Sequence, residues 1–121
     1  MANSMMEINQ VQGTYVVHFR ERLYVDNVKS QEIRDILIEK INENGCKGMV
    51  INLDKIEFLS SEMLNVLLGV NNGIINTKLR IKLCGLTPHS REMLELTRII
   101  RFFDVFPDEE MALLPAAPPL H

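Results

Sequence analysis

The feature that most constrains the fold is an apolar run over residues 48–53, Gly-Met-Val-Ile-Asn-Leu, which leads through a short polar link to Ser60 and Ser61. A nearly unbroken apolar run of this length predicts a strand covered on both faces, as in a parallel sheet flanked by crossover helices. A second apolar segment, residues 61–76, then has helical spacing. Because it is more apolar than a half-exposed helix requires, we expect part of it to touch a partner or a second layer.

Strand and helix patterns alternate along the rest of the chain. The expected elements are a β-hairpin over 6–11 and 14–20, an amphipathic helix over 28–44, a strand near an edge of the sheet over 79–84, a helix over 88–100 with Thr87 as its N-cap, a short strand over 102–106, and a closing helix from 107. Right-handed crossovers would make the later strands parallel. The sequence therefore predicts one α/β domain over residues 1–114, with a mixed, mostly parallel sheet of four to five strands and about four helices. A disordered Pro-rich tail is expected over residues 115–121.

Composition argues against several classes of function. The chain has 16 acidic and 13 basic residues, a formal net charge of −3, and its bases are scattered, which disfavours nucleic acid as a partner. Cys46 and Cys84 form no C-x-x-C, and the histidines have no ligand spacing, so we expect no metal and no cofactor. No apolar run approaches the ~18 residues of a membrane span, and no signal sequence opens the chain, so we expect a cytoplasmic protein without a membrane partner. No acid, base and nucleophile converge, so an enzyme is not expected.

Ser61 is the first candidate for a modification site. A helix start collects unpaired backbone N–H groups and the positive end of the helix dipole, so a serine there either caps the helix or accepts a phosphate that the site tolerates. Serine is also among the best N-cap residues, which is the alternative role for Ser61. Ser60 is equally placed to cap, which would leave Ser61 available.

Residues 52–68 read N-L-D-K-I-E-F-L-S-S-E-M-L-N-V-L-L, which is similar to the pattern D-L-x-x-V-x-F-[ML]-D-S-S-G-L-x-x-L-L of the STAS domain family. Gly-Leu-Thr-Pro at 85–88, Leu-Glu-Leu-Thr at 94–97 and the segment 103–113 resemble the family in the same order. This family includes the bacterial anti-sigma-factor antagonists. The resemblance implies a STAS fold and a protein-interaction switch whose partner is a serine-kinase anti-sigma factor, with a phosphatase that resets it.

The resemblance also implies which residues act. In phosphorylatable members the first serine after the aspartate accepts the phosphate, and by position that residue is Ser61. This chain departs from the pattern, because Ser60 replaces the aspartate, Glu62 the second serine and Met63 the glycine, while Tyr24 replaces an acid associated with partner recognition. The expected partner-binding residues are Tyr24, Asp26, Ser60, Ser61, Glu62 and Met63.

Several alternatives stay open at this level. Glu62 is either an ordinary first-turn acid or a fixed negative charge that biases binding, and Met63 is either a core residue or an exposed, adaptable contact. The departures from the pattern allow a scaffold that is never phosphorylated. A small-molecule or lipid-binding module that uses the apolar second helix is a further possibility.

Overall fold

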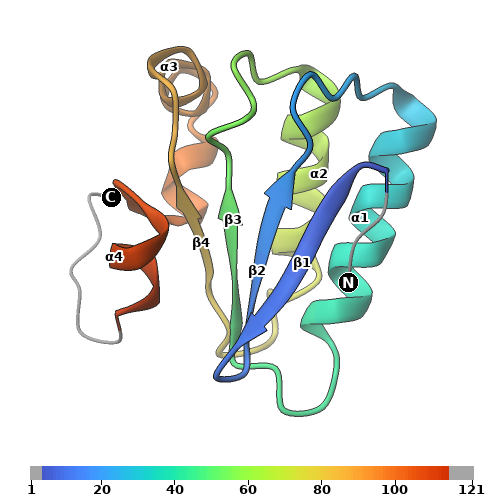
Figure 1. Cartoon of the computed structure of the whole chain (residues 1–121), viewed down its shortest axis with the longest axis vertical. Coiled ribbons are helices and arrows are strands. Elements are labelled where there is room, and N and C mark those ends of the chain that lie inside the picture. Colours follow the sequence, from blue (N-terminus) through green and yellow to red (C-terminus); the bar gives the residue numbers. More distant parts are fainter. Residues whose placement is uncertain (1–3, 115–121) are drawn as a thin grey trace.

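The computed structural model describes residues 4–114, in which five strands form one mixed sheet with helices on both faces (Figure 1). The strands are β1 (Met6–Val11), β2 (Thr14–Phe19), β3 (Gly48–Asn52), β4 (Ile81–Cys84) and β5 (Asp104–Phe106), and they lie side by side in that order. The helices are α1 (Asn27–Ile41), α2 (Ser61–Asn72), α3 (Pro88–Leu96), the 3-10 helix η1 (Ile99–Phe102) and α4 (Glu109–Leu113). Only the β1–β2 pair is antiparallel among these strands, so the predicted mixed, mostly parallel α/β sheet is confirmed.

The hairpin that opens the sheet is fixed by its turn. Gln12 and Gly13 both have positive φ, 49° and 88°, which is the backbone of a two-residue turn that matches the twist of the flanking strands. The strand that follows α1, β3, occupies the centre of the sheet, and all five of its residues are buried. The central position expected for this apolar run is therefore confirmed.

One face of the sheet carries the main core. Val17, Ile51, Leu83 and Val105 point from successive strands into the layer formed by α1 and α2. The apolar excess of α2 is explained by this arrangement, because the helix packs on the sheet and on α1. The expectation that α2 touches a second layer is thus correct, and that layer is the sheet, with α1 packed beside α2.

The opposite face is covered over part of its area by the short helix α4. Ala112 of α4 packs with Val50, Cys84 and Phe106, and the Lys82 ammonium donates a hydrogen bond of 2.8 Å to the Ala112 carbonyl. Strand β4 lies nearer an edge of the sheet than the central β3, as predicted, with β5 outside it. The expectation that its other face is wet was wrong, because α4 covers the face that bears Lys82.

Helices α1 and α3 end earlier than their apolar patterns predict. Helix α1 stops at Ile41 rather than residue 44, because the Asn42 side chain donates a hydrogen bond of 2.9 Å to the Ile38 carbonyl and caps the last turn. Helix α3 stops at Leu96 rather than residue 100, because Arg98 adopts the left-handed conformation at φ 62°. The chain then continues as η1.

Helix α2 also stops at Asn72 rather than residue 76, and Gly73 follows as its C-cap. The predicted tail, residues 115–121, lies outside the described residues. Across residues 4–114, no helix is both long enough and apolar enough to cross a membrane.

Candidate functional site

The candidate site lies at the carboxyl edge of the parallel strands, at the top of Figure 1, where the chain leaves β2, β3 and β4. Three loops meet there, residues 20–26, 53–60 and 85–87. The carboxyl edge of a parallel sheet is where α/β proteins commonly form binding sites, because successive crossovers leave a crevice between the loops. The start of α2, with Ser60 and Ser61, belongs to this edge.

The link from β3 to α2 is anchored by its apolar side chains. Leu53, Ile56 and Leu59 are all buried in the core. Phe58 lies between two of these anchors and is turned outward, with 66% of its surface exposed. An aromatic ring is therefore held in solvent by a loop whose own backbone is fixed.

The start of α3 fixes the same link from the other side. The Thr87 hydroxyl donates a hydrogen bond of 3.0 Å to the Glu57 carbonyl, and the buried Ser90 hydroxyl donates one of 3.2 Å to the Ile56 carbonyl. Thr87 also caps α3, as predicted, by accepting a hydrogen bond from the Ser90 amide. These bonds satisfy loop carbonyls and couple the position of Phe58 to α3.

Gly85 allows the two loops to approach closely. Its φ is +68°, and a Cβ placed there would lie 2.8 Å from Oδ1 of Asn52 and 3.0 Å from Cβ of Asp54. The same Asn52 oxygen accepts the Asp54 amide at 2.9 Å and starts the turn after β3. Both the conformation and the space at residue 85 therefore require glycine.

The structure distinguishes the two serines at the start of α2. Ser60 is the N-cap, with extended backbone angles, and its hydroxyl accepts the Met63 amide at 3.2 Å. Ser61 is the first residue of the helix, and its side chain is exposed. The capping alternative for Ser61 is therefore wrong, and the alternative in which Ser60 caps is correct.

The Ser61 hydroxyl sits in a mixed electrostatic environment. It lies at the positive end of the α2 dipole, which favours a negative charge. The same hydroxyl donates a hydrogen bond of 3.2 Å to Oε2 of Glu62, so a carboxylate is already present beside it. This hydroxyl is accessible to a group-transferring partner, and any added anion would be next to Glu62.

Exposed aromatic residues lie near the two serines. Tyr24 is 74% exposed, and the Phe58 ring meets the His89 ring edge to face with centroids 4.8 Å apart. Tyr24, Phe58, Ser60 and Glu62 line a shallow pocket of about 190 Å³. We call Tyr24, Phe58 and His89 the aromatic surface.

Phe58 and His89 were not among the residues expected at the site. The available signal for Phe58 was an apolar side chain in a short link whose apolar neighbours Ile56 and Leu59 are buried in the core. His89 had no such signal, because its proximity to Phe58 depends on how α3 packs against the link.

Two expected partner-binding residues have structural roles. Met63 is only 2% exposed and packs in the core, so of its two expected roles the core residue is correct and the exposed contact is wrong. It also lines the pocket beside Ser60. Asp26 is exposed, but its carboxylate caps α1 by accepting the Lys29 amide at 2.8 Å. Tyr24, Ser60, Ser61 and Glu62 do lie together at this edge.

Cys84 carries the thiol nearest this edge, and this thiol has little thiolate character. Burial raises the pKa of Cys84 to about 12, with smaller contributions from nearby carboxylates led by Glu109. Within residues 4–114, no group of three or more His, Cys, Asp and Glu side chains is arranged to hold a metal ion. The chemistry that the site offers is therefore that of an exposed hydroxyl beside an aromatic surface.

The sequence from residue 5 to residue 112 matches the STAS domain, so the chain belongs to the STAS domain family. Among curated relatives, it is 23% identical over 111 residues to the anti-sigma F factor antagonist of Paenibacillus polymyxa, covering 92% of this chain and 93% of that protein.

Solved structures agree with this fold. An anti-sigma-factor antagonist (STAS) domain protein from Planctomyces limnophilus superposes with a TM-score of 0.80 at 18% identity, covering 93% of this chain and 97% of that one. The Bacillus protein SpoIIAA, an anti-sigma factor antagonist solved in unphosphorylated and phosphorylated forms, gives a TM-score of 0.66 at 17% identity for both. These alignments cover 88% of this chain and 92% and 96% of the two SpoIIAA chains.

Proposed function

We propose that this protein is an anti-sigma-factor antagonist, a binding module that docks a serine-kinase anti-sigma factor and is switched by phosphorylation of Ser61. The observation that carries the proposal is that the two serines have different structural roles: Ser60 caps α2, and Ser61 remains exposed. The names of the P. polymyxa relative and of SpoIIAA support the choice of partner.

In the unmodified form, the aromatic surface supplies the binding energy. Exposed aromatic side chains held on a fixed backbone lose little conformational freedom on binding, and aromatic residues are enriched among interface hot spots. Tyr24 and Phe58 border the pocket next to Ser60, so a partner side chain inserted there would approach Ser61. A partner bound in this way covers the hydroxyl that it phosphorylates.

Phosphorylation would act on this interface more than on the fold. A phosphate on Ser61 adds about −1.5 to −2 charges beside the Glu62 carboxylate. In the free protein the helix start and water stabilise that charge, whereas a desolvated interface does so only with a cation opposite it. The phosphorylated form is thus released, and a phosphatase restores binding.

The test is phosphate transfer from the cognate anti-sigma factor and Mg-ATP, followed by intact-mass measurement. The wild type should gain one phosphate and Ser61→Ala should gain none. Ser60→Ala is the matched control, since it removes the neighbouring hydroxyl and should still be phosphorylated. An unchanged mass in the wild type, or a phosphate on Ser60, would exclude the proposed switch.

A second candidate is a scaffold that binds constitutively and is never phosphorylated. It is favoured by Glu62, which already places a carboxylate against the Ser61 hydroxyl, where the family pattern has a second serine. This candidate predicts tight partner binding that does not change with ATP. The switch predicts binding that declines as phosphate accumulates, so one binding assay with and without ATP separates the two.

A further inference from the structure

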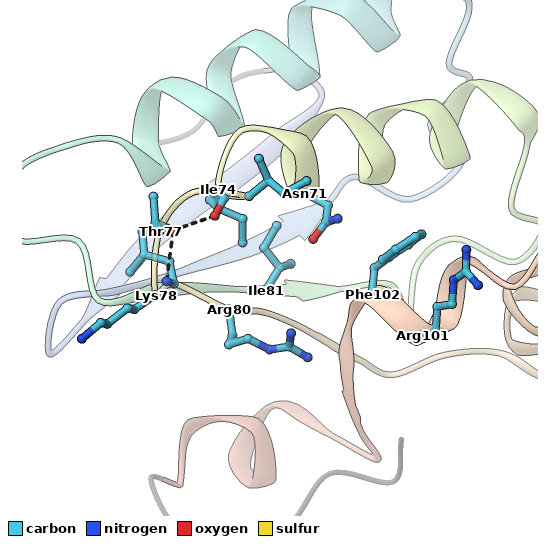
Figure 2. A pocket seen from close by; sticks show the side chains of 10 residues that line it. Asn71, Ile74, Thr77, Lys78, Arg80, Ile81, Arg101 and Phe102 are labelled. Carbon is cyan, nitrogen blue, oxygen red and sulfur yellow. Dashed lines mark hydrogen bonds between the residues drawn. The ribbon is translucent and has the colours of Figure 1, made fainter.

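A second recess lies at the end of the sheet opposite the Ser61 site. It is bounded by the last turn of α2, the loop over residues 73–80, the start of β4, and η1, and has a volume of about 440 Å³ (Figure 2). Small-molecule sites typically have volumes of about 300–1,000 Å³. Because α2 has 12 residues, roughly 18 Å of helix separates this recess from Ser61, so the recess is a distinct site.

The lining combines an apolar floor with cations. Ile81 is fully buried at the base, and Phe102 forms a side wall (Figure 2). Lys78, Arg80 and Arg101 supply three positive charges, and none of the described residues that line the recess is acidic. In a chain with a net charge of −3, this is a local excess of positive charge that would attract small anions.

Intramolecular contacts order the walls before any ligand binds. Thr77 donates to the Ile74 carbonyl at 2.8 Å and accepts the Leu79 amide at 3.1 Å, which fixes the loop after α2. The Arg101 guanidinium lies 4.9 Å from the centre of the Phe102 ring. A preformed wall reduces the entropy lost on binding.

Arg80 is held in the same way. It donates through Nε and Nη2 to Asp104, at 3.2 and 2.7 Å, so its side chain is oriented along the recess. Asp104 neutralises part of this charge, and the Lys78 side chain points away from the other lining residues (Figure 2), which leaves Arg101 as the main cation toward a ligand.

We propose that this recess binds a small amphipathic anion, with its carboxylate or phosphate near the Arg101 cation and its short apolar part against Phe102 and Ile81. The recess is too small and has too few cations to bind nucleic acid, and its apolar floor distinguishes it from a site for a bare inorganic ion. The proposal is independent of the function assigned to Ser61, because the two sites share no residue.

The experiment is an NMR titration of the ¹⁵N-labelled full chain with octanoate, octyl phosphate, inorganic phosphate and octylammonium. Amide shifts should concentrate in residues 71–81 and 99–104 for octanoate or octyl phosphate. Inorganic phosphate should bind more weakly, because it lacks the apolar part, and octylammonium should not bind. Equal affinity for octylammonium, or shifts spread along the whole sheet, would overturn the proposal.

Exposed residues provide variants that leave the fold intact. Arg101→Gln should weaken binding by up to about fivefold, the range for a solvent-accessible ion pair, and Lys78→Gln should weaken it less, because the Lys78 side chain points away from the recess (Figure 2). Ile75 borders the recess and is 71% exposed, so Ile75→Thr reports the apolar contact without removing core. Lys47→Gln removes one exposed charge outside the recess and should leave the Kd unchanged.

Vesicles of phosphatidylglycerol distinguish a membrane-held anion from a free one. Binding of free octanoate or octyl phosphate that is weakened by the recess variants supports the proposal. Binding to vesicles alone, or a Kd that Arg101→Gln and Lys47→Gln change equally, would refute it.

Discussion

The separate roles of Ser60 and Ser61 give the most direct test of the site, because they predict opposite effects of two adjacent substitutions. Ser60→Ala removes the hydroxyl that accepts the Met63 amide at the start of α2. Loss of a serine N-cap lowers the free energy of unfolding by about 1 kcal/mol. At roughly 2.1 cal/mol/K of unfolding entropy per residue over 121 residues, this corresponds to a fall in Tm of about 4 °C.

Ser61→Ala should change the free energy of unfolding by less than about 0.5 kcal/mol, because Ser61 is exposed and alanine is a good helix former. Urea unfolding of the wild type and the two variants, followed by circular dichroism, measures both values. The reverse order, with Ser61→Ala the less stable variant, would show that Ser61 is the cap. The hydroxyl proposed as the phosphate acceptor would then be engaged in the fold, and the proposed switch would lose its basis.

Three further perturbations have defined outcomes. Phe58→Ala should weaken binding of the anti-sigma factor by about 2 kcal/mol or more, the loss typical of a hot-spot aromatic. The free energy of unfolding measured in urea should change by less than about 1 kcal/mol, since most of the ring is already exposed. Equal losses in both measurements would exclude an anchoring role. Gly85→Ala should lower the urea midpoint markedly, because the new Cβ would clash with Asn52 at a positive φ, and an unchanged midpoint would contradict the close approach of the loops. Cys84 should resist a thiol reagent at pH 8 in the native protein and react in denaturant, because burial holds its pKa at about 12; rapid native labelling mapped to Cys84 by mass spectrometry would refute this.

The arrangement of strands and helices could largely be predicted from hydrophobic periodicity. The unbroken apolar run of β3 and the helical spacing of α2 each reflect burial by their neighbours, which is a property encoded locally. Helix ends were less predictable, because single side-chain contacts set them, such as that between Asn42 and the Ile38 carbonyl. The alternation of β4 predicted its place nearer an edge but not the cover on its second face, because that cover comes from α4, which follows later in the chain.

The candidate site was only partly predictable for the same reason. Ser61 could be identified from its place at a strand-to-helix junction, but its availability depended on the backbone angles of Ser60, φ −77° and ψ 164°, which make Ser60 the cap. The two roles of Met63 could not be separated, because the start of a helix does not reveal which first-turn residue faces the core. The contact between Phe58 and His89 joins the β3–α2 link to the first turn of α3 and depends on tertiary packing.

The charges around Ser61 explain why a phosphate there would be sensed by a partner while the fold tolerates it. The helix start stabilises a negative charge by about 0.3–1 kcal/mol. A carboxylate about 4 Å away, as Glu62 would be, opposes it by about 1 kcal/mol per unit charge in water, so a phosphate with about −1.5 to −2 charges has a net cost of about 1 kcal/mol in the free protein. Covering the site with a partner lowers the effective dielectric constant toward about 20, and the repulsion from Glu62 rises about fourfold. The same modification that costs the free domain little therefore opposes the complex strongly, and that difference is what a phosphorylation switch at this position requires.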